Sequence, residues 1–301
     1  MWFNTRTGEP IAECSRRSEY AASSLLPVGG EVEDEVWCTR GMGAVTPEGR
    51  SFEELVREAA QVDVSGWDFS WLDGRATEER PSWGYQRLLR TKLSEVGSAL
   101  DLQTGGGEVL AGAAPYPPTM VAVESWETNL RKATDLLHGR GVAVVRGADE
   151  PPLPFADDSF ELIISRHPVT VWWAEIHRLL VPGGRYFAQH VGPASVAELS
   201  EFFLGPLSEE SRRSRHPQVE EAAAEQAGME VLETRCERTR IEICDIGAVV
   251  YLLRKCPWWV PDFSVETYRQ KLYELHELIQ QEGLFIANST RTLFEARKSA
   301  S

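Results

Sequence analysis

Residues 99–113 have the sequence ALDLQTGGGEVLAGA, and this stretch decides the fold that we expect. Apolar residues enter it, Asp101 interrupts them, glycines fill positions 105–107, and a helix-like segment starts at Glu108. Glycines let the backbone turn sharply and approach a ligand closely, because no Cβ intervenes. A strand that leads through such a turn into a helix predicts a ligand site at the turn.

Two phosphate-binding patterns do not fit this turn. A dinucleotide fingerprint needs glycines at its first, third and sixth places, and the sixth place counted from Gly105 is Leu110. A P-loop needs Gly-Lys-Ser/Thr, which the turn lacks. The carboxylate of Asp101 would repel a pyrophosphate, although it can hold an amino group. The turn therefore favours a ligand with a positive group, and an NAD-dependent oxidoreductase remains only as a weaker alternative.

The chain around this turn alternates short apolar runs with helix-like segments. This spacing predicts a parallel sheet covered on both faces. We expect a Rossmann-like α/β fold with a doubly wound, mostly parallel seven-stranded sheet and helical lid elements from the N-terminal and C-terminal parts. The expected strands are 99–102, 119–123, 142–145, 160–164, 186–189, 230–243 and 284–295. The expected helices that follow the turn are 108–114, 126–138, 169–180, 194–203, 219–227, 246–254 and 265–281.

Three regions are expected along the chain. Residues 1–45 have little periodicity and are predicted to be a poorly structured extension. Residues 46–92 are predicted to form a helical and aromatic cap, which opens with a capping box at Ser51. Residues 93–301 are predicted to form the main domain, with a helical insertion near 256–283.

Acidic residues stand at the ends of three successive strands. Asp101 lies in the glycine turn, Glu124 ends the second strand, and Asp149 follows the third. A carboxylate in the second position can accept hydrogen bonds from both hydroxyls of a ribose. The set matches a ligand that combines a ribose, an adenine and a positively charged amino-acid tail.

Two further stretches, together with this pattern, carry a family resemblance. Residues 149–167 have the sequence DEPPLPFADDSFELIISRH, and residues 175–187 have EIHRLLVPGGRYF, in which Pro-Gly-Gly is expected to stop a helix. With LDLQTGGGE and VAVES, they resemble class I S-adenosylmethionine-dependent methyltransferases, most of all the group related to the ubiquinone and menaquinone methyltransferases. The resemblance covers residues 95–195 well and the rest loosely.

The resemblance implies S-adenosylmethionine as the cofactor and assigns its contacts by position. The implied cofactor-binding residues are Asp101, Gln103, Thr104, Gly105, Gly106, Gly107, Glu124, Ser125, Trp126, Ala148, Asp149, Ser165 and Arg166. Glu124 would bind the ribose and Asp149 the adenine amino group. Gln103 departs from the family, which usually has glycine there, so its side chain would reshape the loop or contact the methionine carboxylate.

The methyl acceptor is less determined by the sequence. His167 ends the fourth strand and is the candidate general base, although a lone histidine is more often structural. The candidate substrate-binding residues are Trp71, Trp83, Tyr85, His190, Trp258 and Trp259. They either pack in the core or form an aromatic lid, and a lid would favour a small acceptor that is planar or apolar.

Composition limits the remaining possibilities. The formal net charge is −15, so a nucleic acid is a disfavoured partner. No apolar run approaches the length of a membrane span, the N-terminus does not resemble a signal peptide, and the cysteines show no metal-ligand spacing. We expect a cytoplasmic small-molecule methyltransferase without a metal. An RNA-base methyltransferase and a catalytically inactive cofactor-binding relative are the alternatives.

Overall fold

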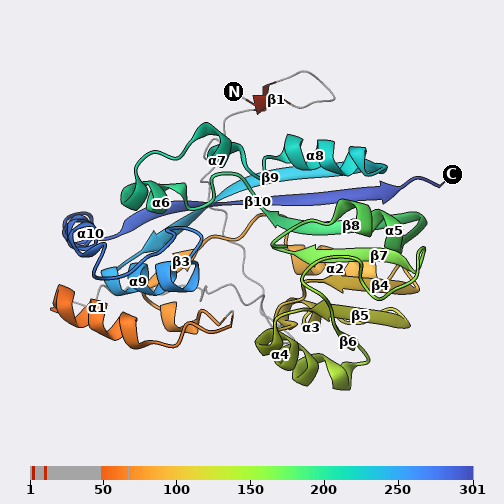
Figure 1. Cartoon of the computed structure of the whole chain (residues 1–301), viewed down its shortest axis with the longest axis horizontal. Helices are drawn as coiled ribbons and strands as arrows, with labels where there is room; N and C mark the ends of the chain where they lie inside the picture. Colours follow the sequence, from red (N-terminus) through yellow and green to blue (C-terminus); the bar gives the residue numbers. More distant parts are fainter. Residues whose placement is uncertain (1, 4–9, 12–48, 67, 301) are drawn as a thin grey trace, which may run out of the picture. The chain divides into compact units, whose positions relative to one another are not determined.

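The apolar runs form one eight-stranded sheet in this computed structural model, which describes residues 2–3, 10–11, 49–66 and 68–300. Five strands are parallel: β4 (Ser98–Leu102), β5 (Thr119–Glu124), β6 (Ala143–Arg146), β7 (Phe160–Arg166) and β8 (Leu180–Val191). Three more are antiparallel: β10 (Phe285–Lys298), β9 (Met229–Ile243) and β3 (Ala76–Glu78). The strand order is β3-β9-β10-β8-β7-β4-β5-β6 (Figure 1).

The predicted fold class is confirmed, with eight strands in place of seven. The additional strand is β3, which pairs Ala76 with Ile243 at the edge of β9. Its three residues lie in the region predicted to be a helical and aromatic cap. So short a strand gives no period-2 pattern, and only its partner strand defines it.

The helices follow the predicted segments with small shifts at their ends. They are α1 (Phe52–Gln61), α2 (Tyr85–Leu93), α3 (Glu108–Ala111), α4 (Glu127–Leu137), α5 (Trp173–Leu179), α6 (Ala197–Leu204), α7 (Glu209–Arg213), α8 (Pro217–Gln226), α9 (Ile246–Lys255) and α10 (Arg269–Glu282). Two 3-10 turns are η1 (Ser70–Leu72) and η2 (His138–Arg140). The capping box of α1 is present, because Ser51 N donates to Glu54 Oε2 at 2.9 Å and Glu54 N donates to Ser51 Oγ at 3.3 Å. Helix α7 was not expected from the sequence.

Helices cover both faces of the parallel strands. On one face α2, α3 and α4 pack on residues such as Leu162, Ile164 and Phe187. On the other, α5 and α8 pack on residues such as Ile163 and Tyr186. Neighbouring residues of one strand therefore point to opposite cores, as the pleat requires. We call these the α2–α4 face and the α5–α8 face.

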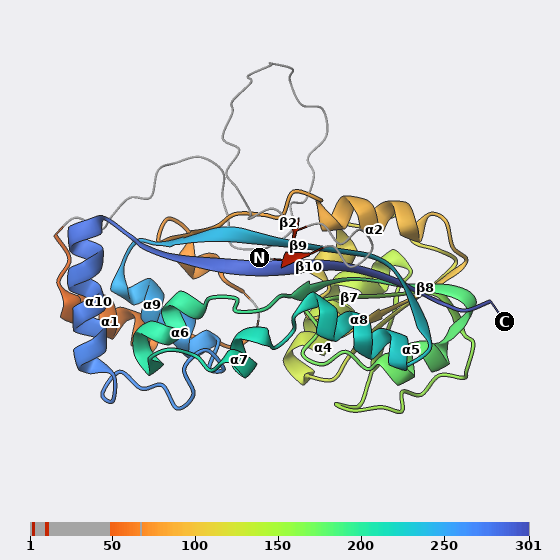
Figure 2. The ribbon, with the colours of Figure 1, turned by 90° about the horizontal axis from the view of Figure 1, so that it is seen from above.

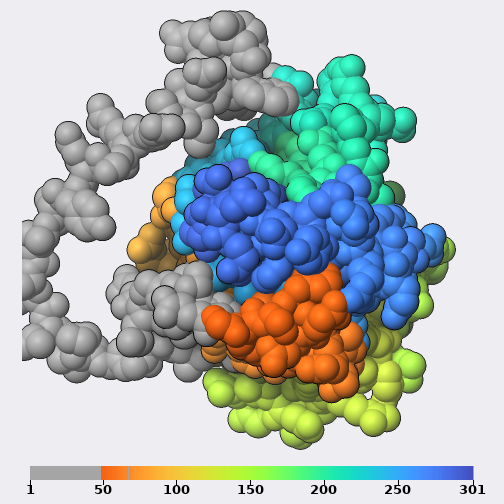
Figure 3. Space-filling view, turned by 90° about the vertical axis from the view of Figure 1, so that its left-hand side faces the viewer, coloured from red at the N-terminus to blue at the C-terminus, as the bar shows by residue number. Residues whose placement is uncertain are grey.

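Strands β9 and β10 continue far beyond the parallel strands. Strand β8 pairs with β10 only over 185–191, whereas β9 follows β10 along its whole length. Figure 2 shows this ribbon running from the parallel strands toward α9 and α10. There it supports a third hydrophobic core, built from α1, α6, α9, α10 and β3, which we call the appended core. Figure 3 shows α1 packed against α10. The rings of Phe52 and Tyr273 contact each other edge-on, with 5.4 Å between their centroids.

The predicted regions divide differently in the structure. The segment 46–92 is not one cap: α1 and β3 belong to the appended core, while α2 packs on the α2–α4 face. The expected insertion near 256–283 supplies α10 to the appended core. The expected extension 1–45 lies outside the described residues, apart from the short antiparallel pair β1 (Trp2–Phe3) and β2 (Pro10–Ile11). None of the helices in the described ranges has the length and apolar character to span a bilayer.

Candidate active site

The glycine turn follows β4 as the sequence predicts. Gln103, Gly105 and Gly107 all have positive φ angles, of 57°, 64° and 85°. A Cβ on Gly105 would meet no atom within 4 Å, whereas one on Gly107 would approach Leu137 Cδ1 to 2.8 Å. Gly107 therefore lets the turn pack closely on α4, and Gly105 leaves open space where a ligand can approach.

Glu124 organises this turn from the neighbouring strand. Its Oε2 accepts a hydrogen bond from Gly105 N at 2.8 Å, and its Oε1 accepts from Ser125 N and Trp126 N, both at 2.9 Å. The residue is buried. A carboxylate offers about four acceptor positions, so three amide bonds leave capacity for a further donor. Glu124 is held in a fixed position at the carboxyl end of β5.

Asp101 is the second buried acid of the site. Thr104 Oγ1 donates to its Oδ2 at 2.6 Å. Burial raises the pKa of Asp101 to about 7, and the charge of Glu124 acts in the same direction, while the Thr104 hydrogen bond opposes it. A positively charged ligand beside this carboxyl would favour its ionised form.

Gln103 connects two loops. Its Nε2 donates to Thr170 O at 2.8 Å, and its Oε1 accepts from Val169 N at 2.7 Å. The glutamine thus joins the glycine turn to the loop that follows β7. Both ends of the amide are bonded to backbone, so the side chain fixes the position of that loop.

The third predicted strand end carries Ala148 and Asp149, which are both exposed. They follow β6 directly, and Gly147 N donates to Glu124 O at 3.0 Å, so this loop is tied to the end of β5. Trp126, whose backbone N donates to Glu124, has 44% of its surface exposed, which is unusual for tryptophan. An exposed indole next to the carboxylate can stack on a planar base.

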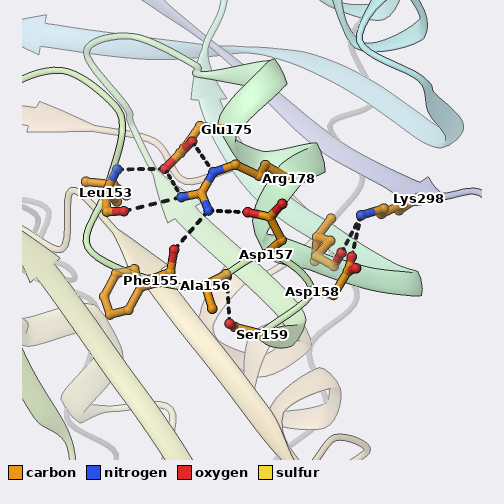
Figure 4. A network of polar contacts seen from close by, with 10 residues as sticks. Leu153, Phe155, Ala156, Asp157, Asp158, Ser159, Glu175, Arg178 and Lys298 are labelled. Atoms are coloured by element: carbon orange, nitrogen blue, oxygen red, sulfur yellow. Dashed lines mark hydrogen bonds and ion pairs between the residues drawn. The ribbon is translucent and has the colours of Figure 1, made fainter.

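The acidic turn that gave the strongest sequence signal is fixed by one arginine (Figure 4). The guanidinium of Arg178 bonds the carbonyl of Phe155 at 2.9 Å and the carboxylate of Asp157 at 2.7 Å. It also donates to Glu175, whose Oε1 accepts from Leu153 N at 2.7 Å. These bonds hold the segment between Asp149 and β7 on helix α5. These bonds explain the acidic motif, because they fix the position of the loop between β6 and β7.

Ser165, Arg166 and His167 stand at the carboxyl end of β7. Ser165 is buried, and its Oγ donates to Leu102 O at 2.9 Å, which ties β7 to β4 just before the glycine turn. Its own carbonyl accepts from Tyr85 OH at 3.1 Å. These residues thus lie at the sheet edge that also carries Asp101, as expected for parallel neighbours.

His167 is part of a hydrogen-bond chain that sequence reasoning missed. Trp83 Nε1 donates to Gln189 Oε1 at 2.8 Å, so the amide nitrogen of Gln189 is the group that faces His167 Nε2 at 2.9 Å. Since that nitrogen can only donate, Nε2 is the acceptor and the proton lies on Nδ1. Burial holds the pKa of His167 well below its usual value, and the charge of Arg166 acts in the same direction.

This arrangement argues against His167 as a general base. Its basic nitrogen is already occupied by Gln189, and Nδ1 carries a proton. The ring is instead a neutral hydrogen-bond donor. Gln189 lies on β8, and only an alternation of faces in that strand could have drawn attention to it.

The predicted aromatic lid is wrong, because its members belong to separate parts of the fold. Trp71 and Trp259 pack on the appended core, Trp83 and Tyr85 are buried on the α2–α4 face, and Trp258 is 59% exposed. Trp71 stacks on Tyr251 at 5.0 Å between ring centroids. Trp71, Trp83, Tyr85 and Trp259 are therefore core residues, each packed in the cluster of its own part of the fold.

His190 packs on a different face of the sheet from Trp83 and Tyr85. It is buried on the α5–α8 face, where it stacks on Phe294 at 5.6 Å and its Nε2 lies 3.0 Å from Tyr186 OH. Burial lowers its pKa to about 3. Trp83 and His190 therefore occupy opposite faces of one sheet and cannot line one pocket as predicted.

Comparison with known proteins gives one family match. Residues 100–188 match the family described as "Methyltransferase domain". These residues contain the glycine turn, Glu124, Asp149 and the end of β7. Residues 100–188 are a methyltransferase domain. The predicted recognition is confirmed at this level, as a methyltransferase domain with a class I fold, whereas the ubiquinone-related subgroup stays a prediction.

The chain is also similar to solved structures of other proteins. The YcgJ protein of Bacillus subtilis superposes with a TM-score of 0.50 at 17% identity, over 72% of this chain and 99% of that one. The BH2331 protein of Bacillus halodurans gives 0.49 at 20% identity, over 70% and 98%. Phosphoethanolamine N-methyltransferase 2 of Haemonchus contortus gives 0.46 at 18%, over 83% and 61%. No curated protein matches the chain.

Proposed function

We propose that this methyltransferase acts on a small-molecule acceptor and that its cofactor lies across the carboxyl ends of β4, β5 and β6. The observation that carries the proposal is the fixed carboxylate of Glu124, held by three backbone amides next to the open side of Gly105. The acceptor position that the three amides leave free suits a hydroxyl of a ribose. The other acid, Asp101, suits the ammonium group of the methionine part.

The remaining contacts of the proposal follow the strand ends. Trp126 would lie on the adenine face and Asp149 would accept from the adenine amino group, since both are exposed beside Glu124. The proposed cofactor set is completed by Gln103, Thr104, Gly105, Gly106, Gly107, Ser125, Ala148, Ser165 and Arg166. Gln103 would act through the loop that it holds, because its amide is bonded to residues 169 and 170.

The cofactor, when bound, supplies a methyl group on a sulfonium, which a nucleophile can take without an added catalyst. The part left to this chain is to bind and orient, which can account for much of such a rate enhancement. The loop after β7 is held in place by Gln103 and by the Ser165 hydrogen bond. His167 contributes an N–H donor, so an acceptor that has already lost its proton suits this site.

The expectation of a planar or apolar acceptor depended on the aromatic lid, so we do not include it in the proposal. A small-molecule acceptor is still favoured over RNA by the net charge of −15. Membership of the ubiquinone-related group and a cytoplasmic location are kept as parts of the proposal.

Substitution of Glu124 by glutamine tests the proposal. The amide would present its N–H₂ to Gly105 N–H and lose a charge-assisted acceptor, which is worth about 1.5–3 kcal/mol. We therefore expect S-adenosylhomocysteine to bind at least about tenfold more weakly to Glu124→Gln by isothermal titration calorimetry. The matched control is Glu127→Gln, which removes the same charge from an exposed pair with Arg131 at the start of α4.

Equal affinity in Glu124→Gln and the unaltered chain, with both folded by circular dichroism, would show that the ribose lies elsewhere. An unaltered chain that binds no S-adenosylhomocysteine would refute the cofactor site itself.

A further inference from the structure

The loop that follows β7 is joined to the glycine turn by one side chain. We call residues 167–170 the β7 loop. The Oε1 of Gln103 accepts from Val169 N at 2.7 Å, and its Nε2 donates to Thr170 O at 2.8 Å. Strands β4 and β7 are parallel neighbours, paired in register up to their last residues. The turn and the β7 loop therefore leave the sheet side by side, and the amide of Gln103 bridges them.

The rest of the β7 loop is held by hydrogen bonds to its backbone. Arg215 donates from Nη1 to Pro168 O at 3.1 Å and from Nη2 to Val169 O at 2.6 Å. His167 N donates to Gln189 O, on β8, at 2.7 Å. Val169 itself is 75% exposed, so burial of its side chain does not fix the loop. The order of the loop thus depends on a few hydrogen bonds and on how firmly their partners are fixed.

The backbone of Gln103 has a conformation that is unusual for glutamine. Its φ angle is 57°, and it is the first residue after β4. Residues other than glycine, asparagine and aspartate seldom adopt this left-handed conformation, which persists where surrounding contacts hold it. The two hydrogen bonds of the amide are such contacts. A glycine would take the same conformation without strain, so what the glutamine adds is its side-chain bridge to the β7 loop.

The bridge starts in the turn where we propose that the cofactor binds. Gln103 lies between Asp101 and Gly105, two positions from each, and the Cα of Gly105 faces open space. A ligand in contact with this turn restricts its motion. Because Gln103 belongs to the turn and its amide holds the β7 loop, the restriction extends to the loop. Binding that orders one segment in this way lowers the entropic cost of ordering the next.

We infer that Gln103 is a positioning residue for methyl transfer, which couples cofactor binding at the glycine turn to the order of the β7 loop. The inference rests on the proposed function, because that proposal places the cofactor at the turn. The β7 loop begins at the carboxyl end of its strand, where ligands of such sheets bind, so it is the loop that an acceptor would approach. Cofactor that binds first would thereby prepare the acceptor side of the site.

Hydrogen exchange of the full chain, followed by mass spectrometry, tests this coupling. The amide of Val169 is a direct reporter, because it donates to Gln103. The peptide that contains the β7 loop is compared with and without saturating S-adenosylhomocysteine. In the unaltered chain we expect the ligand to slow exchange of this loop at least about fivefold, the lower end of common couplings between two sites.

Gln103→Met isolates the amide, because methionine keeps the length of the side chain but has no N–H donor and only a weak acceptor. Without ligand, exchange of the β7 loop should be at least about fivefold faster in this variant, since two hydrogen bonds are lost. S-adenosylhomocysteine should then slow it by less than about twofold. Gln103→Glu, which has no donor for Thr170 O when ionised, carries the same prediction should Gln103→Met fail to fold.

Gln86→Met is the matched control. Gln86 is also partly buried, and its Nε2 donates to a backbone oxygen, that of Val109, at 3.1 Å. Its loss removes a glutamine amide that bonds α3 and not the β7 loop. Exchange of the β7 loop and its response to S-adenosylhomocysteine should therefore stay within about twofold of the unaltered chain.

The outcomes separate the inference from the proposed function. If S-adenosylhomocysteine binds the unaltered chain by isothermal titration calorimetry but leaves exchange of the β7 loop unchanged, the inference fails and the proposed function stands. An equal response of the loop in Gln103→Met and the unaltered chain would show a merely structural role for the amide. A loss of ligand affinity in Gln103→Met with the loop response preserved would assign Gln103 to direct contact with the cofactor. An unaltered chain that does not bind the ligand would refute the proposed cofactor site, and the inference with it.

Discussion

The buried carboxyl of Asp101 should make this protein less stable as the pH rises. Asp101 is 7% exposed, and the carboxylate of Glu124 lies near it. Its pKa rises from 3.8 to about 7 in the folded chain, mainly through burial. The contribution of the protonated carboxyl to stability is therefore complete below pH 3.8 and is lost as the pH rises through 7.

The size of this effect follows from the two pKa values. At about 1.36 kcal/mol for each pH unit between them, the whole contribution is about 4 kcal/mol. Most of it, about 3 kcal/mol, is lost between pH 5 and pH 8. Asp101→Asn has no charge to bury and can still accept from Thr104, so it should not show this loss.

Urea unfolding at pH 5, 6, 7 and 8 measures the difference. We expect the free energy of unfolding of Asp101→Asn, relative to the unaltered chain, to increase by about 3 kcal/mol from pH 5 to pH 8. Glu127→Gln serves as the control, because it removes a carboxylate that is 43% exposed, and its profile should follow that of the unaltered chain.

A constant difference between Asp101→Asn and the unaltered chain across this range would refute the reasoning. It would mean that Asp101 is ionised in the folded protein throughout, and that water or a counterion reaches it. A difference with the opposite slope would mean that the Thr104 hydrogen bond outweighs burial.

Two further predictions concern the appended core. Asp245→Ala should lower the free energy of unfolding by about 3–5 kcal/mol in urea titrations. Asp245 caps α9, and its loss leaves Arg75 without its bidentate partner. A decrease below about 1 kcal/mol would contradict this prediction. Trp71→Ala should cost about 2–4 kcal/mol of stability through the lost contact with Tyr251. The affinity of Trp71→Ala for S-adenosylhomocysteine should be unchanged. A loss of that affinity without a loss of stability would show that Trp71 belongs to the binding site.

Local patterns determined the part of the fold that we propose binds the cofactor. The alternation of apolar runs and helices predicted β4 to β8 in the right places, because each βα unit is specified within a few tens of residues. The three strand-end acids were found for the same reason. Carboxyl ends of parallel strands lie at one edge of a sheet whatever the loops do, so Asp101 and Glu124 had to be neighbours.

The tertiary structure alone decided what surrounds that edge. Trp71 and Trp83 are close in sequence but pack in different cores, because β3 lies between them and pairs with β9, which is far away in the chain. The protonation of His167 depends on Gln189, whose amide is oriented by Trp83. Contacts of this kind join residues from separate elements, and no period within one element encodes them. The sequence by itself therefore determined the strand ends at which we propose the cofactor binds, whereas packing between distant segments decided what surrounds His167.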